Sequence, residues 1–187
     1  ADAARLFILS DSTPEKDVQW SEEGIISAFK FIQKLWNLNL KVLNEINKNH
    51  EKNEKNEIIK YTNKFVKNVT ENLENFRYNK IIANFHEIYA FFSNEITNKK
   101  YTKATLTENY QKILIIMSPA IPHLSSECLN LMNAKKNKWP SYDETLIEED
   151  EVDIVVQING KKRGLIRTKK NIKEDELLVI INKELTL

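Results

Sequence analysis

Apolar residues recur every three or four positions through most of residues 1–132, with polar residues between them. This spacing places the apolar side chains on one face of an α-helix and therefore predicts a series of amphipathic helices. The most regular stripe carries Ile81, Phe85, Ile88 and Phe92. The helices that we predict cover, within a residue or two, positions 1–11, 21–47, 58–73, 78–96, 105–117 and 122–132.

Residue types at the ends of these segments support the predicted boundaries. Ser21 is a favoured N-cap, and two acids follow it where the helix dipole favours negative charge. The residue before Pro119 avoids the helical region, so one helix ends there, whereas Pro122 suits the first turn of the next helix. The polar residues 50–56 and 97–104 are predicted to be connectors.

The pattern changes after residue 133. Residues 134–151 lack a helical stripe and are predicted to form a linker, and a β-branched run follows at residues 154–158. Asn159 and Gly160 both tolerate the positive φ of a two-residue hairpin turn, which makes this pair a strong hairpin signal. The return strand then covers residues 161–168.

Side chains along the return strand are expected to alternate between its two faces around Leu165 and Arg167. A final helix is predicted at residues 173–183. Because a lone hairpin is only marginally stable in water, we expect further strands to follow in the complete protein. The predicted fold class is mainly α: a bundle of four to five helices followed by a small α+β domain with a β-hairpin, which is truncated here. Its regions are residues 1–20, the bundle at 21–133, the linker at 134–151 and the partial α+β domain at 152–187.

Composition and charge narrow the class of protein. The chain has 187 residues, of which 41% are hydrophobic and 29% charged, and its net charge is +1. It has no apolar run of the roughly 18–20 residues that a membrane span needs and no signal peptide. It begins without Met inside a predicted helix, so we expect a fragment. A single cysteine, Cys128, excludes an internal disulfide and fits a reducing cytosol.

The residues offer little for catalysis or metal binding. His123 and Cys128 are five apart on one predicted helix, so they face different sides and form no nucleophile–base pair. The three histidines have no ligand-like spacing, and we predict no metal site. The acids between Glu144 and Asp153 lie in the predicted linker, where solvation explains them.

Positive charge is concentrated near the C-terminus. Residues 142–153 carry seven acids and no Lys or Arg, whereas residues 157–173 carry seven Lys or Arg and no acid. Cations at a hairpin tip are suited to nucleic-acid phosphates, although a solvated hairpin with scattered charge is the alternative. The candidate phosphate-binding residues in this run are Lys161, Lys162, Arg163, Arg167, Lys169 and Lys170. Within the bundle, Lys30 and Lys34 share one helix and either face RNA or form a solvated polar face.

Several segments, in order along the chain, resemble the C-terminal third of the bacterial-type leucyl-tRNA synthetases, which are class I enzymes. Two of these segments, the one that ends in Trp20-Ser21 and the one in the hairpin, are typical of the leucyl enzymes; Val18 and Gln19 depart mildly from the leucyl pattern. The helical segments are shared with the valyl, isoleucyl and methionyl relatives. The segments are ADAAR at residues 1–5, PEKDVQWS at 14–21, KFIQKLWN at 30–37, SPAIPHLSSE at 118–127, WP at 139–140 and VQINGKKRG at 156–164.

The resemblance implies that residues 1–20 are the end of a stem-contact segment that follows the catalytic domain. It also implies that residues 21–133 form an anticodon-binding-type bundle, and that this bundle and residues 152–187 both bind a leucine-specific tRNA. The parent enzyme would ligate leucine to tRNA through leucyl-adenylate, using ATP and Mg, as a cytoplasmic monomer. The HIGH and KMSKS motifs are absent, so this fragment should be inactive alone and bind no cofactor. The competing hypotheses are the same region of a valyl or isoleucyl enzyme, and a noncatalytic helical domain that binds protein through an apolar groove.

Two residues near the N-terminus receive specific expectations. Arg5 would brace the neighbouring catalytic loop or form a local salt bridge with an acid such as Asp2. Trp20 precedes the N-cap Ser21 and is expected to act as a hydrophobic staple.

Overall fold

The helices predicted from the apolar stripes are present in the computed structural model, which describes residues 1–11, 13–48, 57–98, 101–134, 138–147, 151–169 and 172–184. These residues belong to two units, Ala1–Ile147 and Glu148–Leu187, and each is described by itself. The predicted connector at residues 50–56 lies outside the described residues.

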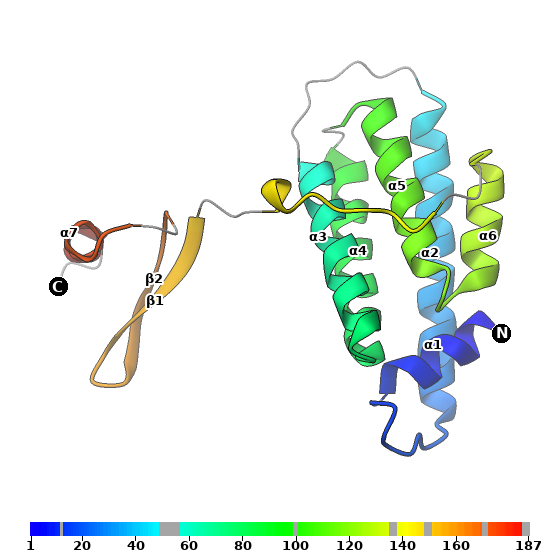
Figure 1. The fold of residues 1–187 in the computed structure, drawn as a ribbon, viewed down its shortest axis with the longest axis horizontal. Helices are drawn as coiled ribbons and strands as arrows, with labels where there is room; N and C mark the ends of the chain where they lie inside the picture. The colour runs from blue at the N-terminus through cyan, green and yellow to red at the C-terminus, as the bar shows by residue number, and fades with distance from the viewer. Residues whose placement is uncertain are drawn as a thin grey trace. The chain divides into compact units, whose positions relative to one another are not determined.

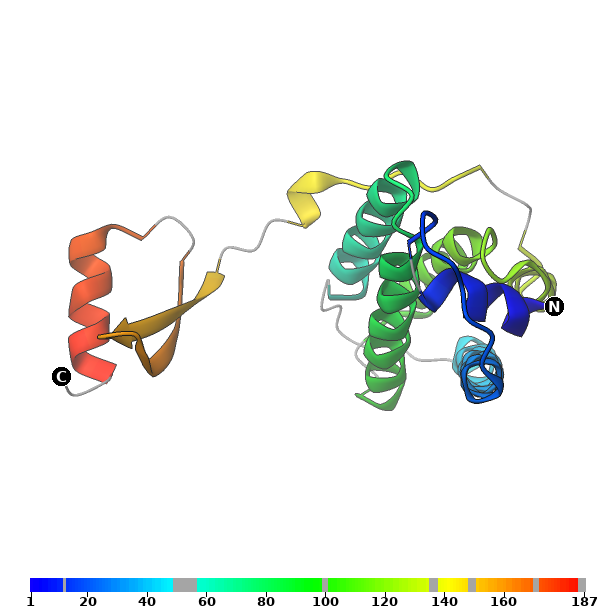
Figure 2. The ribbon, with the colours of Figure 1, turned by 90° about the horizontal axis from the view of Figure 1, so that it is seen from below.

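The first unit is a helical bundle in which α2 to α5 run side by side and α1 crosses one end (Figures 1 and 2). Among the described residues, no helix combines the length and apolar composition that crossing a membrane requires. The helices of this unit are α1 (Asp2–Asp11), α2 (Glu22–Ile46), α3 (Glu57–Glu74), α4 (Tyr78–Asn98), α5 (Lys103–Met117) and α6 (Pro122–Leu131), followed by the short 3-10 helix η1 (Glu144–Leu146).

The core forms where the apolar stripes of the helices meet. Phe85 and Phe92 of α4 are 0% and 1% exposed, and they pack with Val42, Leu114 and other buried side chains in a single cluster. Burying such side chains contributes roughly 1.5–3 kcal/mol each, which is why tertiary packing rather than helix propensity holds these helices. The fold-class prediction of a mainly α bundle followed by a β-hairpin is confirmed.

Asp2 caps a helix that lies more than a hundred residues away. Its buried carboxylate accepts hydrogen bonds from the backbone N–H of Leu124 at 2.7 Å and of His123 at 3.3 Å, in the first turn of α6. The His123 Nδ1 lies 2.8 Å from the same carboxylate. Ile121, the local N-cap residue of α6, has no capping side chain, so Asp2 supplies the cap from α1.

Arg5, one helical turn after Asp2, fastens the segment just before α6. Its Nη2 donates to the carbonyl oxygen of Pro119 at 2.6 Å, and its Nε donates to that of Ala120 at 3.1 Å. These carbonyl groups follow the end of α5, where the backbone has no hydrogen-bond partner within the helix. Of the two alternatives for Arg5, a salt bridge with Asp2 is not the contact that the structure shows, because both side chains bind the backbone of the α5–α6 turn instead.

Gly24 allows α1 and α2 to approach closely. A Cβ at this position would come within 3.0 Å of two ring carbons of the buried Phe7. The edge of Trp20 rests on Phe7 as well, with ring centroids 5.5 Å apart and an interplanar angle of 77°. Trp20 thus packs against α1, which differs from the local staple predicted for it, and it remains 63% exposed.

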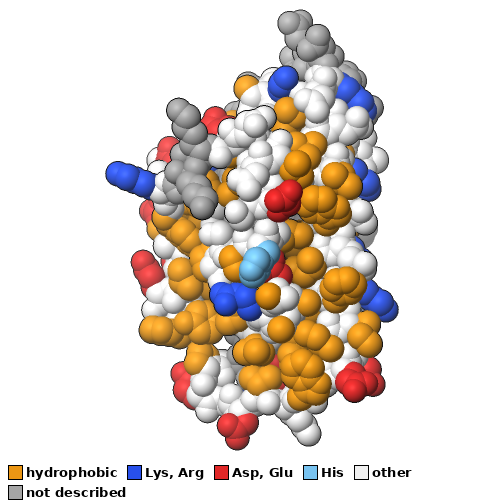
Figure 3. Space-filling model, turned by 90° about the vertical axis from the view of Figure 1, so that its right-hand side faces the viewer, with side chains coloured by type: hydrophobic (Ala, Val, Ile, Leu, Met, Phe, Trp, Pro, Cys, Tyr) orange, Lys and Arg blue, Asp and Glu red, His pale blue; other side chains and the backbone are white. Residues whose placement is uncertain are grey.

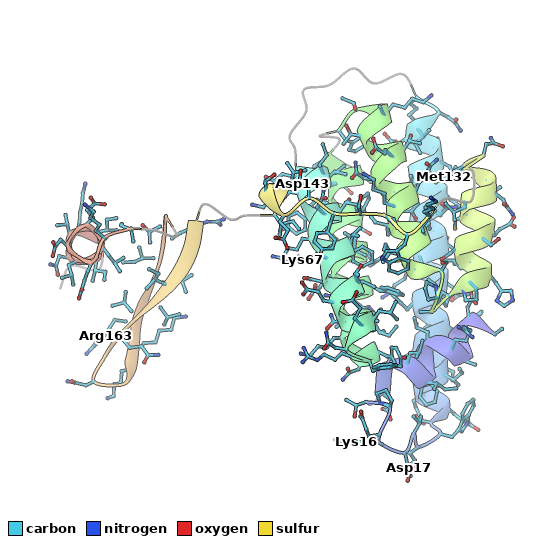
Figure 4. All side chains as sticks on the ribbon, in the orientation of Figure 1. Lys16, Asp17, Lys67, Met132, Asp143 and Arg163 are labelled. Carbon is cyan, nitrogen blue, oxygen red and sulfur yellow. The ribbon has the colours of Figure 1, made fainter. Side chains whose placement is uncertain are left out.

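Residues 138–147, predicted to be part of a linker, instead form a strap along α3. The Trp139 Nε1 donates to Thr70 Oγ1 at 2.9 Å, and the Asp143 N–H donates to Asn63 Oδ1 at 2.8 Å. Lys67 binds Glu144 at 2.9 Å, and Figure 4 shows Lys67 and Asp143 next to each other. The polar side chains that hold the strap come from α3, which is why its own sequence resembles a linker.

The second unit contains β1 (Glu151–Ile158), β2 (Lys161–Lys169) and α7 (Glu174–Glu184), and the two strands pair antiparallel. Ile166 and Thr168 are buried at 1% and 7% exposure. Leu165 is 52% exposed and Arg167 is exposed as well, so these two residues lie on the face opposite Ile166 and Thr168.

We predict that Gly24→Ala destabilises the bundle. The added methyl group overpacks the contact with Phe7 at a cost of about 1–3 kcal/mol, and alanine recovers about 1 kcal/mol of helix propensity. The expected net loss of about 1 kcal/mol should lower the urea midpoint. Ser27→Ala, at an exposed position of the same helix, should leave the midpoint unchanged or raise it. A Gly24→Ala protein as stable as the parent would contradict the proposed close contact.

We also predict that Asp2→Asn weakens the α6 cap by about 2 kcal/mol near neutral pH. Burial raises the pKa of the Asp2 carboxyl, but hydrogen bonds from the Leu124 N–H and from His123 outweigh burial and lower the pKa below 3.8. Because the folded-state pKa is lowered, the stabilisation is present above the unfolded pKa and is lost as pH falls through the folded value.

Urea unfolding at a series of pH values measures this difference. The gap between the parent and Asp2→Asn should be constant from about pH 6 to 5 and should narrow below about pH 4. Asp17→Asn, in the exposed loop between α1 and α2, is the matched control and should show no gap. A gap that widens at low pH would contradict the capping role.

Candidate nucleic-acid interface

The β-hairpin presents three consecutive cations near its tip. Asn159 and Gly160 have φ values of 52° and 74°, so the two-residue turn predicted from this pair is confirmed. Lys161, Lys162 and Arg163 follow directly and are all exposed. None of these three side chains makes an ion pair with another described residue, so their charges are available to a ligand.

A β-bulge lies within this cationic segment. Val156 pairs with Gly164 and Gln157 pairs with Lys162, which leaves Arg163 without an opposing residue. A bulge interrupts the strict alternation of side chains and re-aims the bulged residue. Figure 4 labels Arg163 on the hairpin. The sequence signal for the bulge is Gly164, because a glycine inside a strand often marks one.

The remaining predicted hairpin residues have different positions. Arg167 is exposed and lies opposite Asp153 in the strand register. Lys169 is the last residue of β2, and Lys170 lies outside the described residues. The structure therefore groups Lys161, Lys162 and Arg163 most closely.

The bundle carries a second group of cations on α2. Lys30, Lys34 and Lys41 are exposed and, at 100° per residue, lie within about 40° of one another around the helix. They form a cationic ridge, which we define as these three residues. The hairpin group belongs to the second unit and the ridge to the first, so the predicted site residues are divided between the two units.

His86 of α4 lies beside the ridge and was not predicted as a site residue. Its imidazole stacks on the buried Phe31 of α2 with ring centroids 3.7 Å apart and an interplanar angle of 25°. Burial, together with the positive charge of Lys34, lowers the pKa of His86 below 6.5. No local sequence pattern points to His86, because Lys34, whose charge lowers its pKa, is 52 positions away in the chain.

The other side of α2 is apolar. A groove of about 730 Å³ is lined mainly by α1, α2 and α6, with Phe29, Ile32, Trp36 and Leu124 among its residues. Figure 3 shows hydrophobic side chains gathered on this face of the first unit. Without clustered cations, this side suits a protein contact better than a polyanion.

The described residues do not form a nucleophilic site at Cys128. The thiol is buried, and burial, with a smaller contribution from Glu127, raises its pKa to about 12. A thiol with that pKa stays protonated near neutral pH and is a poor nucleophile. Among the described residues, no group of three or more His, Cys, Asp or Glu side chains could hold a metal ion.

A family model and curated relatives match this chain. The family described as the anticodon-binding domain of tRNA ligase matches residues 55–181. The leucine–tRNA ligase of Orientia tsutsugamushi is 41% identical over 171 residues, which cover 88% of this chain and 20% of the relative. That of Fervidobacterium nodosum is 35% identical over 189 residues, which cover 95% of this chain and 23% of the relative. The chain thus spans about a fifth of the length of these relatives.

A solved structure shares the fold. It is the ternary complex of the Agrobacterium radiobacter K84 agnB2 LeuRS with tRNA and LeuAMS. The match has a TM-score of 0.77 and 22% sequence identity, and it covers 97% of this chain and 25% of the other. At that identity the likeness shows a shared fold.

Proposed function

This chain belongs to the anticodon-binding domain family of tRNA ligases, and we propose that it is the tRNA-binding C-terminal part of a leucine–tRNA ligase. The observation that carries the proposal is the run of three exposed cations, Lys161, Lys162 and Arg163, beside the tight turn of the hairpin.

Phosphate recognition explains why this arrangement suits RNA. Lys and Arg side chains that neutralise phosphates release counterions, which supplies most of the sequence-independent affinity. Contacts of this kind also set the register of the nucleic acid on the protein. Lys161, Lys162 and Arg163 would contact one part of the tRNA, and we propose that Arg167, Lys169 and Lys170 contact phosphates as well.

Lys30 and Lys34 would contact a second part of the tRNA backbone. Binding through two units raises the overall affinity, because the second contact forms within an already assembled complex. This arrangement needs no preformed pocket, and the cationic ridge is open on α2.

The substrate of the longer enzyme is proposed from the relatives. Both are leucine–tRNA ligases, which favours leucine over the valine or isoleucine alternatives. In that enzyme leucine and ATP, with Mg²⁺, would form leucyl-adenylate and then leucyl-tRNA in the cytoplasm, with the enzyme acting as a monomer. The chain lacks the HIGH and KMSKS motifs, so we assign this chemistry to other parts of the enzyme and expect the fragment to be inactive alone.

A protein-interaction domain is the second candidate function. The apolar groove of about 730 Å³ on α1, α2 and α6 favours it, because exposed apolar surfaces of this kind mark protein contacts. The two functions differ in their response to salt. Binding to RNA phosphates weakens steeply with ionic strength, whereas an apolar contact does not.

We predict that reversing the hairpin charges with Lys161→Glu, Lys162→Glu and Arg163→Glu weakens tRNA binding. The affinity for a leucine tRNA transcript at low salt should fall about ten- to hundredfold. The slope of log affinity against log salt should lose about one unit for each phosphate contact removed. Fluorescence anisotropy with labelled tRNA over a salt series measures both quantities.

The matched control carries Lys16→Glu, Lys103→Glu and Lys183→Glu, which make the same change in net charge at scattered exposed positions. Its affinity should fall much less. Thermal unfolding followed by circular dichroism should show an unchanged bundle in both variants. If both variants lose the same affinity for tRNA, the loss is explained by net charge alone, and the hairpin is ruled out as a specific contact.

A further inference from the structure

We propose that His86 joins Lys30 and Lys34 in binding an RNA phosphate, and that its imidazole takes up a proton when the phosphate binds. This inference rests on the proposed function, since the ligand is the same polyanion. It assigns a role to a residue on a different helix from the ridge, and it makes the affinity for tRNA depend on pH.

The geometry holds His86 at the edge of the ridge. The ring of Phe31, which is only 4% exposed, covers one face of the imidazole, and the stacking separation is 3.7 Å. Tyr89, one turn further along α4, meets Phe31 edge-on at 5.8 Å and helps to hold that ring in place. The His86 side chain nevertheless remains exposed, so its ring nitrogens can reach a ligand.

The charges around His86 favour a phosphate over other groups. Lys34 on α2 is the one charged residue in the described chain that shifts the pKa of His86, and it acts with burial to lower that pKa. The acid next in sequence on α4, Glu87, contributes no such shift, and neither does any charged group of α1 or α3 among the described residues. Neutral imidazole beside free ammonium groups is therefore the state of the protein without RNA near neutral pH.

A bound phosphate reverses this balance. Its negative charge offsets the repulsion from Lys34 and favours the protonated imidazole, which can then donate a hydrogen bond to the phosphate. The pKa of His86 is consequently higher in the complex than in the free protein. The affinity must then rise as pH falls through the pKa of the complex, and it must level off below the pKa of the free protein.

The test is the affinity for a leucine tRNA transcript between pH 8.0 and 5.5 at constant ionic strength. The parent protein should bind about three- to tenfold more tightly at pH 6.0 than at pH 7.5, since each unit of pKa shift corresponds to a factor of ten. Titration calorimetry in two buffers of different ionisation enthalpy should register the uptake of up to one proton. His86→Gln should remove both effects.

His123→Gln is the matched control, because His123 is an exposed histidine of the same unit on α6 and lies away from the ridge. This variant should retain the pH dependence. Lys34→Gln supplies a second measurement that keeps the His86 ring in place. It should bind tRNA more weakly, and the pH dependence should move to higher pH, because removing the lysine charge raises the pKa of His86 in the free protein and in the complex.

The outcomes separate this inference from the proposed function. A pH dependence or a proton uptake that persists unchanged in His86→Gln overturns the role of His86 and leaves tRNA binding intact. If the parent protein fails to bind tRNA at every pH and salt concentration, the proposed function fails and the inference fails with it. If His86→Gln loses the pH dependence and His123→Gln keeps it, the result supports the role of His86 in phosphate binding.

Discussion

The arrangement of the bundle depends on a hydrogen-bonded junction between α1 and the turn that joins α5 to α6. Asp2 accepts from N–H groups at the start of α6, and Arg5 donates to the carbonyl oxygens of Pro119 and Ala120 just before it. The two side chains are one helical turn apart and opposite in charge. The negative Asp2 meets the N–H groups at the start of α6, and the positive Arg5 meets the carbonyl oxygens that follow α5. This junction holds α1 across the end of the bundle and presses Phe7 onto Gly24, which sets the contact between α1 and α2.

That junction also determines which sides of α2 are available to partners. One side of α2 packs into the core, and a second forms the apolar groove with α1 and α6. The cationic ridge occupies the remaining exposed side, beside the Phe31–His86 stack. Apolar and cationic side chains therefore occupy separate faces of one helix. Under the proposed function, the cationic face would contact phosphates through charge and spacing, without the enclosed geometry that a catalytic site requires.

The strap along α3 changes how the second unit is tethered. Residues 138–147 were predicted as flexible linker because they are polar and lack a helical stripe. Asn63, Lys67 and Thr70 of α3 hold them through hydrogen bonds and an ion pair. These contacts fix residues 138–147 to the first unit, so this part of the predicted linker belongs to the bundle.

The sequence by itself determined the helices, the Ser21 cap, the hairpin turn and the clustered cations, because periodicity, capping and turn preferences depend on residues a few positions apart. Only the tertiary structure decided the Asp2 and Arg5 contacts, the strap, the His86 stack and the burial of Ile166. Each of these joins residues far apart in the chain or depends on which face of an element is covered, and no local pattern encodes that choice. The hairpin residues could therefore be predicted from sequence, whereas His86 required the packing of α2 against α4.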